Sequence, residues 1–266
     1  MTDKELDPRN IDTFILDLDG TVYLSDHLIE GAADFLRFLR DSGRRFVFIT
    51  NNSSRTAEEY VNKLTRLGIE CSLENIYTSL DATLAWLAGQ EGRRVLPLGV
   101  PSLVEEVKTS GFEIVESEPD WVLLGFDQTL TYDKIRSAAR ALLGGAGFVA
   151  THPDVVCPTA DGPIPDTGSF IKMFEAATGR TPVICGKPYP AMIEGALARL
   201  GSGAERTAIA GDRLYTDMAM GRAAGIMAIL VLSGETRLGD IETAPPEHRP
   251  HLVFENLGAL LAAMKD

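Results

Sequence analysis

The sequence has few of the features that accompany secretion, metal knuckles or membrane insertion. Its 266 residues include only three cysteines, Cys71, Cys157 and Cys185. This odd number, widely spaced and without a Cys-x-x-Cys pair, fits neither a disulfide framework nor a zinc site. The longest apolar stretch, Ile226 to Leu232, is too short to span a bilayer. The first ten residues lack the basic and apolar regions of a signal peptide. We therefore expect a cytoplasmic protein.

Positive charge is also scarce. The chain carries 25 Lys and Arg residues against 38 Asp and Glu residues, a formal net charge of −13. Such a surface repels the phosphate backbone of nucleic acid and anionic lipid, so we expect neither nucleic acid nor a membrane as a partner. A hydrophobic content of 45% with 24% charged residues is enough for one large core or two modest ones, and it argues against disorder.

Strand-like apolar runs alternate with amphipathic helical patterns along the whole chain. The pattern predicts an α/β fold with two parts. A doubly wound parallel-sheet (Rossmann-like) core is expected from residues 1–80 and 183–266. A smaller α/β cap domain, residues 81–182, is expected as an insertion into that core, and its length is that of an ordinary domain.

One stretch, Thr13 to Val22, reads T-F-I-L-D-L-D-G-T-V and holds the first candidate site. Its apolar run predicts a buried parallel strand, with Asp17 and Asp19 at the carboxyl end, where ligands bind in open α/β sheets. The two carboxylates would lie on one face of a strand. At about 4 Å and an effective dielectric constant near 20 they would repel by roughly 4 kcal/mol. Unless they form an ordinary acidic turn, the pair therefore requires a cation or a proton to hold it, and a bound Mg²⁺ is the simplest answer.

Further polar residues follow other predicted strands: Thr50 and Asn51, then Lys187, and then Asp212 with Asp217. Taken singly, each has an ordinary alternative, such as a helix cap or a solvated loop lysine. Because the carboxyl ends of parallel strands share one edge of a sheet, we expect these side chains to lie side by side. Their joint occurrence at strand ends favours a site.

The motifs and their order resemble those of a known family. They are D-L-D-G-T, I-T-N-N-S-S, T-G-R-T-P-V-I-C-G-K-P and G-D-R-L-Y-T-D. Together they resemble the NagD/p-nitrophenyl phosphatase branch of the haloacid dehalogenase (HAD) superfamily, over essentially the whole chain. Members of this branch carry a large α/β (type C2) cap between the second and third motifs. The short separation of Asp19 from Thr50 and the long one of Thr50 from Lys187 agree with that layout.

The resemblance implies Mg²⁺-dependent hydrolysis of a small phosphate monoester through an aspartyl-phosphate. Asp17 is then the nucleophile, and Asp19 is the general acid and base. Phosphate binding falls to Thr50, Asn51 and Lys187. The expected Mg²⁺ ligands are the Asp17 and Asp212 carboxylates and a backbone oxygen of Asp19, with Asp217 orienting the ligands from a second shell.

Two departures from the pattern of the branch mark a candidate specificity loop. Where the branch commonly has T-N-x-D, this chain has Thr151-His152-Pro153-Asp154, and where P-G-x-G-S is common it has Pro165-Asp166-Thr167-Gly168-Ser169. The loop from His152 to Ser169 is therefore expected to set specificity. Its candidate contact residues are His152, Asp154, Cys157 and Ser169. A surface role for His152 and an apolar packing role for Cys157 are the alternatives.

The sequence does not select one substrate. Relatives act on nucleoside monophosphates, sugar phosphates, pyridoxal phosphate, phosphoglycolate or p-nitrophenyl phosphate, so the expected partner is a small phosphorylated metabolite. A dehalogenase would need neither Asp19 as acid/base nor Asp212, and a receiver-like signalling module lacks the inserted domain. A phosphomutase and a non-catalytic phosphometabolite-binding protein stay open. So does a homo-oligomer through the cap, which relatives often use as an interface.

Overall fold

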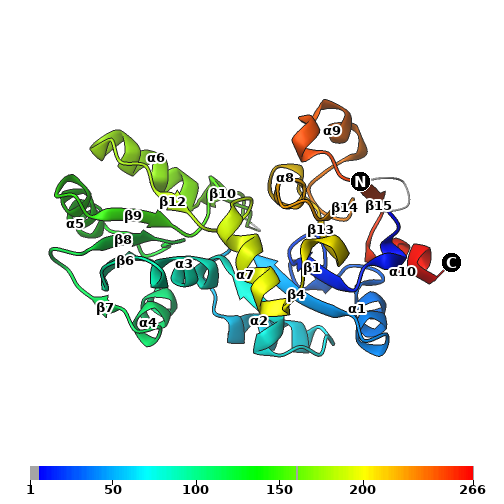
Figure 1. Cartoon of the computed structure of the whole chain (residues 1–266). Coiled ribbons are helices and arrows are strands. Elements are labelled where there is room, and N and C mark those ends of the chain that lie inside the picture. Colours follow the sequence, from blue (N-terminus) through cyan, green and yellow to red (C-terminus); the bar gives the residue numbers. More distant parts are fainter. Residues whose placement is uncertain (1–5, 160, 266) are drawn as a thin grey trace. The chain divides into compact units, whose positions relative to one another are not determined.

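The computed structural model describes residues 6–159 and 161–265, which form two compact units (Figure 1). The first unit contains residues 6–50, Ala57–Tyr77 and 193–265, and the second contains Asn51–Thr56 and Thr78–Met192. Each unit has its own parallel sheet. Among the described residues, no helix combines the length and the apolar character that crossing a membrane requires.

A six-stranded sheet in the order β15-β14-β13-β1-β4-β5 forms the centre of the first unit. Its strands are β1 (Thr13–Asp17), β4 (Arg45–Thr50), β5 (Ile76–Thr78), β13 (Thr207–Gly211), β14 (Met227–Val231) and β15 (Leu252–Phe254). From β1 the chain adds strands first on one side and later on the other, as in a doubly wound fold. Every residue of β1, β13 and β14 is buried, which explains why these strands appear in the sequence as continuous apolar runs.

Helices accompany this sheet in the first unit. The helices are α1 (Ala32–Asp41), α2 (Ala57–Arg66), α8 (Ala219–Ala223), α9 (Leu238–Thr243) and α10 (Leu257–Lys265), with α7 (Pro190–Leu200) divided between the units. Helix α1 buries Phe35, Leu36 and Leu39, which recur at helical spacing. The Phe35 ring meets Phe14 of β1 edge to face, with 5.4 Å between the ring centroids. This packing anchors the strand that carries Asp17. A short hairpin, β2 (Tyr23–Leu24) with β3 (His27–Leu28), follows the strand.

The second unit contains a five-stranded parallel sheet in the order β12-β9-β8-β6-β7. The strands are β6 (Arg94–Leu98), β7 (Glu113–Ile114), β8 (Trp121–Leu124), β9 (Gly147–Ala150) and β12 (Val183–Ile184). Four helices accompany them: α3 (Ser79–Ala88), α4 (Pro101–Thr109), α5 (Tyr132–Leu143) and α6 (Thr167–Thr178). An antiparallel hairpin, β10 (Val156–Cys157) with β11 (Ile164–Pro165), lies within the candidate specificity loop.

The predicted α/β class with parallel sheets is confirmed, but one strand has a different neighbour. The sequence groups Val183 onward with the core, whereas β12 pairs with β9 through Val183↔Val149 and Ile184↔Ala150. Lys187 therefore does not follow a strand of the six-stranded sheet, and the expectation of four strand ends on one sheet edge is wrong for this position. An apolar pattern indicates a strand without naming its partner. The domain boundaries expected from the sequence stay a prediction.

Candidate active site

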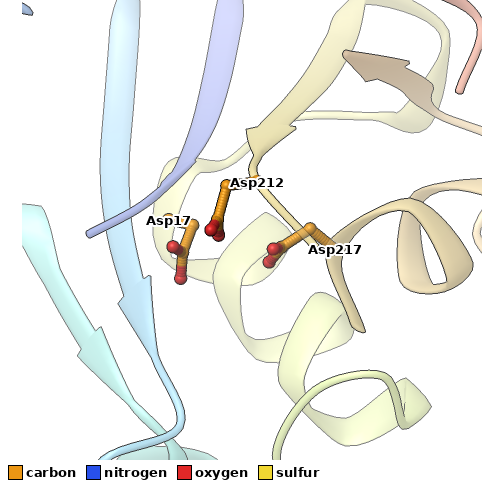
Figure 2. A group of neighbouring side chains, drawn as sticks. All are labelled: Asp17, Asp212 and Asp217. Carbon is orange, nitrogen blue, oxygen red and sulfur yellow. The ribbon is translucent and has the colours of Figure 1, made fainter. Parts of the chain in front are cut away.

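Three acidic side chains converge in the first unit (Figure 2). Asp17 ends β1, Asp212 directly follows β13, and Asp217 lies in the π-helical turn η4 (Leu214–Met218). Because β1 and β13 are parallel neighbours, with Leu16 opposite Ala210, their carboxyl ends lie together. All three side chains are buried, and one carboxylate oxygen from each lies within 4.8 Å of the others. A cluster of this kind is suited to a hard cation.

Mutual repulsion makes this cluster costly without compensation. At this spacing each pair of ionised carboxylates repels by about 3–4 kcal/mol at an effective dielectric constant near 20. Backbone amides supply part of the compensation: the Glu235 N–H donates to Asp212 Oδ2 at 2.6 Å, and the Arg213 N–H donates to Asp217 Oδ2 at 3.3 Å. A cation held among these carboxylates would supply the rest.

Arg213, the third residue of G-D-R-L-Y-T-D, is a positively charged neighbour of this cluster and was not among the predicted site residues. Its Nε lies 2.9 Å from Glu235 Oε2. Burial acts to lower the pKa of Arg213, but Tyr215, then Asp17 and two further carboxylates outweigh it and raise the pKa overall. The guanidinium therefore stays charged beside the acidic cluster.

Glycines leave the space in which Asp212 sits. A Cβ at Gly234 would lie 1.9 Å from Asp212 Oδ2, and one at Gly20 would lie 2.4 Å from the same atom. Gly20 also has φ +87°, which favours glycine. The cradle holds the Asp212 carboxylate close to the ends of β1 and β13. With three buried carboxylates as donors, the residues present fit Mg²⁺, which prefers hard oxygen ligands.

Asp19 lies outside the converging group and has an exposed side chain. The turn after β1 fixes its position: the Gly20 N–H donates to the Tyr23 carbonyl at 2.8 Å, and the Tyr23 hydroxyl donates to Asp19 Oδ2 at 3.3 Å. Burial, followed by the charge of Asp19, raises the pKa of Tyr23, so the phenol keeps its proton and remains a donor. Lys63 Nζ lies 3.6 Å from the centroid of the Tyr23 ring. Tyr23 was not among the predicted site residues, because no sequence motif links a tyrosine to this carboxylate.

In the second unit, the side chain of Asn51 holds the main chain of Lys187. The Lys187 N–H donates to Asn51 Oδ1 at 2.8 Å, and Asn51 Nδ2 donates to the Lys187 carbonyl at 3.1 Å. The same Nδ2 donates to Asp154 Oδ2 at 3.1 Å. Both Asn51 and Lys187 are buried. Thr50, the last residue of β4, is buried in the first unit.

The structure divides the predicted site residues into two groups. Asp17, Asp212 and Asp217 meet in the first unit, to which Asp19 and Thr50 also belong, and Asn51, Asp154 and Lys187 meet in the second.

Within the candidate specificity loop, His152 does not lie at the surface, which was the alternative role for this residue. This side chain is fully buried, and its Nε2 lies 3.3 Å from Asp166 Oδ1. Cys157, in β10, is half-buried, and the Ser169 hydroxyl donates to the Val155 carbonyl at 2.7 Å. His152 and Ser169 therefore stabilise the loop itself.

Two family models match different parts of the chain. The model of a haloacid dehalogenase-like hydrolase matches residues 14–113, and a HAD-hydrolase-like model matches residues 184–260. The dihydroxyacetone phosphatase of Corynebacterium glutamicum (strain R) is 34% identical over 256 residues, which cover 96% of this chain and 92% of that protein.

Solved structures of phosphatases are similar to this chain over nearly its whole length. The 4-nitrophenylphosphatase of Thermotoga maritima matches with a TM-score of 0.93 at 44% sequence identity, and the match covers 97% of this chain and 98% of that protein's chain. A glycerol phosphate phosphatase of Mycobacterium tuberculosis in complex with magnesium has a TM-score of 0.89 at 35% identity, over 95% of this chain and 77% of its own.

Proposed function

The chain belongs to the haloacid dehalogenase-like hydrolase family, and we propose that it is a Mg²⁺-dependent phosphatase that hydrolyses small phosphate monoesters. The observation that carries this proposal is the convergence of three buried carboxylates, Asp17, Asp212 and Asp217, at the ends of two neighbouring parallel strands. A protein that only folded in this way would have no need to bury three carboxylates together.

The first half of the reaction uses Asp17 and Asp19. A carboxylate oxygen of Asp17 attacks phosphorus, and the bond between phosphorus and the ester oxygen breaks. Asp19 gives its proton to the departing oxygen, so an alcohol leaves and an acyl phosphate remains on Asp17. The exposed position of the Asp19 carboxylate gives it access to a leaving group.

The second half returns both residues to their starting state. The Asp19 carboxylate takes a proton from a water molecule, and the oxygen of that water attacks phosphorus. The bond between phosphorus and Asp17 breaks, which releases inorganic phosphate and the free carboxylate. One residue thus serves as acid and then as base.

The negative charge on the phosphoryl group has to be neutralised by several groups. We assign the metal ligands to the Asp17 and Asp212 carboxylates and a main-chain oxygen of Asp19, with Asp217 orienting them from its position beside both carboxylates. Bound Mg²⁺ neutralises negative charge on the phosphoryl oxygens. Phosphate binding is assigned to Thr50, Asn51 and Lys187, of which the last is the cationic donor.

The substrate class stays broad because relatives of similar identity carry different names: a dihydroxyacetone phosphatase, a 4-nitrophenylphosphatase and a glycerol phosphate phosphatase. The loop from His152 to Ser169 is our candidate for selecting among such esters. The net charge of −13 supports the proposal that the partner is a small phosphorylated metabolite and neither nucleic acid nor a membrane. A cytoplasmic location and a homo-oligomer formed through the cap belong to the same proposal.

Hydrolysis of a panel of phosphate monoesters, with Mg²⁺ and with EDTA, tests this function. We expect release of inorganic phosphate with Mg²⁺ and loss of release with EDTA, because the clustered carboxylates repel a phosphate when no cation is bound. The ranking of the esters would name the substrate class. No release from any ester would contradict the proposal and would favour a phosphomutase or a binding protein.

Replacing Tyr23 tests how Asp19 is held. In Tyr23→Phe the hydroxyl that donates to Asp19 Oδ2 is lost, so the orientation of the Asp19 carboxyl group is no longer fixed by this hydrogen bond. In single-turnover measurements of the first half-reaction, we expect release of glycerol from glycerol phosphate to slow about tenfold and release of p-nitrophenolate to change less than about twofold, because p-nitrophenolate leaves without a proton. Tyr132→Phe, which removes an exposed phenol, is the matched control. Equal slowing of both esters would contradict a role in orienting the acid.

A further inference from the structure

Two buried polar side chains meet where the candidate specificity loop begins and ends. His152 is fully buried, and only 7% of the Asp166 side chain is exposed; His152 Nε2 lies 3.3 Å from Asp166 Oδ1. The Thr167 hydroxyl lies 3.5 Å from the same nitrogen. Burial raises the pKa of Asp166, and the charge of His152 opposes this rise. Buried polar side chains are tolerated when polar partners lie close, and each member of this pair is such a partner for the other.

The pair lies beside the contacts that hold the phosphate-binding residues assigned above. The Gly168 N–H, in the first turn of α6, donates to the Asp154 carbonyl at 2.8 Å. A Cβ at Gly168 would lie 2.1 Å from the Pro153 carbonyl oxygen, so this turn packs tightly against residues 153–154. Asp154 Oδ2 in turn accepts from Asn51, and Asn51 holds both main-chain groups of Lys187.

We propose that the His152–Asp166 pair is a positioning element for phosphate binding. It fixes residues 153–154 from both ends of the loop, so that the Asp154 carboxylate holds the Asn51 amide and the amide holds the Lys187 main chain. This rests on the proposed function, which assigns phosphate binding to Asn51 and Lys187. The pair therefore acts on the affinity for the phosphoryl group more than on the chemical step.

A double-mutant cycle tests the coupling. The variants are His152→Asn, Asp166→Gly and both together, measured for KM and kcat on p-nitrophenyl phosphate and for inhibition by inorganic phosphate. We expect each single change to raise KM and the inhibition constant of phosphate about tenfold, with kcat within about threefold. The double variant should be no worse than either single one, because the second change removes a group that has already lost its partner.

Two further variants separate positioning from stability. Asp166→Asn keeps an oxygen that can accept from the Thr167 N–H at the start of α6, a bond of 2.6 Å, and replaces Asp166→Gly in the cycle if that protein does not fold. Thr131→Ala removes a helix cap from α5 in the same unit and should leave KM unchanged. The proposal would be overturned if the increases in KM multiplied in the double variant. It would also be overturned if the single variants left KM unchanged, as Thr131→Ala should.

Phosphate binding is also measured without turnover, as the rise in unfolding temperature that inorganic phosphate produces. If the wild-type protein hydrolyses no ester, the proposed function fails, while the same cycle on this temperature shift still tests the pair. Coupled losses of the shift would support the positioning role, and independent losses would overturn it.

Discussion

Asp17→Asn is expected to abolish turnover while the fold is kept. The amide has nearly the volume of the carboxylate but is not a nucleophile, so no acyl phosphate can form; we expect kcat to fall by about 10⁵-fold or more. Asp17 is buried beside Asp212 and Asp217. Loss of one of three like charges should therefore raise stability in EDTA, by about 1–3 kcal/mol after screening and relaxation. The measurements are phosphate release and the unfolding temperature in EDTA.

The control for Asp17→Asn is an aspartate on the surface of the same unit. Asp41 ends helix α1 and is exposed, so Asp41→Asn should keep the full rate and the wild-type unfolding temperature. Mass spectrometry must show that the introduced asparagine has not deamidated, because a small fraction of restored aspartate would mimic residual activity. Turnover that persists in verified Asp17→Asn protein would contradict the nucleophile assignment.

Strand positions could be predicted because burial on both faces leaves a continuous apolar run in the sequence. This holds for β1, β13 and β14, whose residues are all buried. The neighbour of β12 could not be predicted, since its two residues pair with β9 of the second unit through contacts that no local pattern encodes. The partition into a core of residues 1–80 and 183–266 and a cap of residues 81–182 stays a proposal.

The start of helix α3 is marked by a capping box, which the pattern of apolar residues alone does not reveal. Strand β5 ends at Thr78, and helix α3 begins at the next residue, Ser79. The Thr78 hydroxyl accepts from the Asp81 N–H at 3.1 Å, and Asp81 Oδ2 accepts from the Thr78 N–H at 2.7 Å. This reciprocal pair is a capping box, which can be recognised in the sequence as T-x-x-D and places the helix boundary correctly.

Local motifs located the acidic residues of the candidate site but not the residues that hold them. Asp17 is the last residue of one buried strand and Asp212 directly follows another, and the apolar runs before them predict these positions. Tyr23, which donates to Asp19, and Gly234, which leaves room for Asp212, act through contacts that only the folded chain creates. The surface alternative for His152 was wrong because its partner, Asp166, lies at the far end of the loop. Polar composition alone does not show whether a loop histidine has a buried partner.

Gly234→Ala is expected to weaken Mg²⁺ binding by about tenfold to a hundredfold. The added Cβ would lie 1.9 Å from Asp212 Oδ2 and 2.5 Å from its Cγ, so the carboxylate must move. The Glu235 N–H, which donates to the same oxygen at 2.6 Å, opposes that movement. The measurements are the Mg²⁺ concentration for half-maximal activity and the rise in unfolding temperature with Mg²⁺. Gly239→Ala is the control, because a Cβ there has no neighbour within 4 Å.

Comparison with Asp212→Asn separates displacement of the ligand from loss of its charge. Both variants should need more Mg²⁺, and a tenfold weaker affinity removes about 1.4 kcal/mol of the stabilisation that saturating Mg²⁺ provides. Without Mg²⁺ they should differ: Asp212→Asn relieves repulsion with Asp17 and Asp217 and gains stability, whereas Gly234→Ala keeps all three charges and does not. If Gly234→Ala requires no more Mg²⁺ than Gly239→Ala does, then Asp212 does not hold the metal from this cradle, and the ligand assignment is wrong.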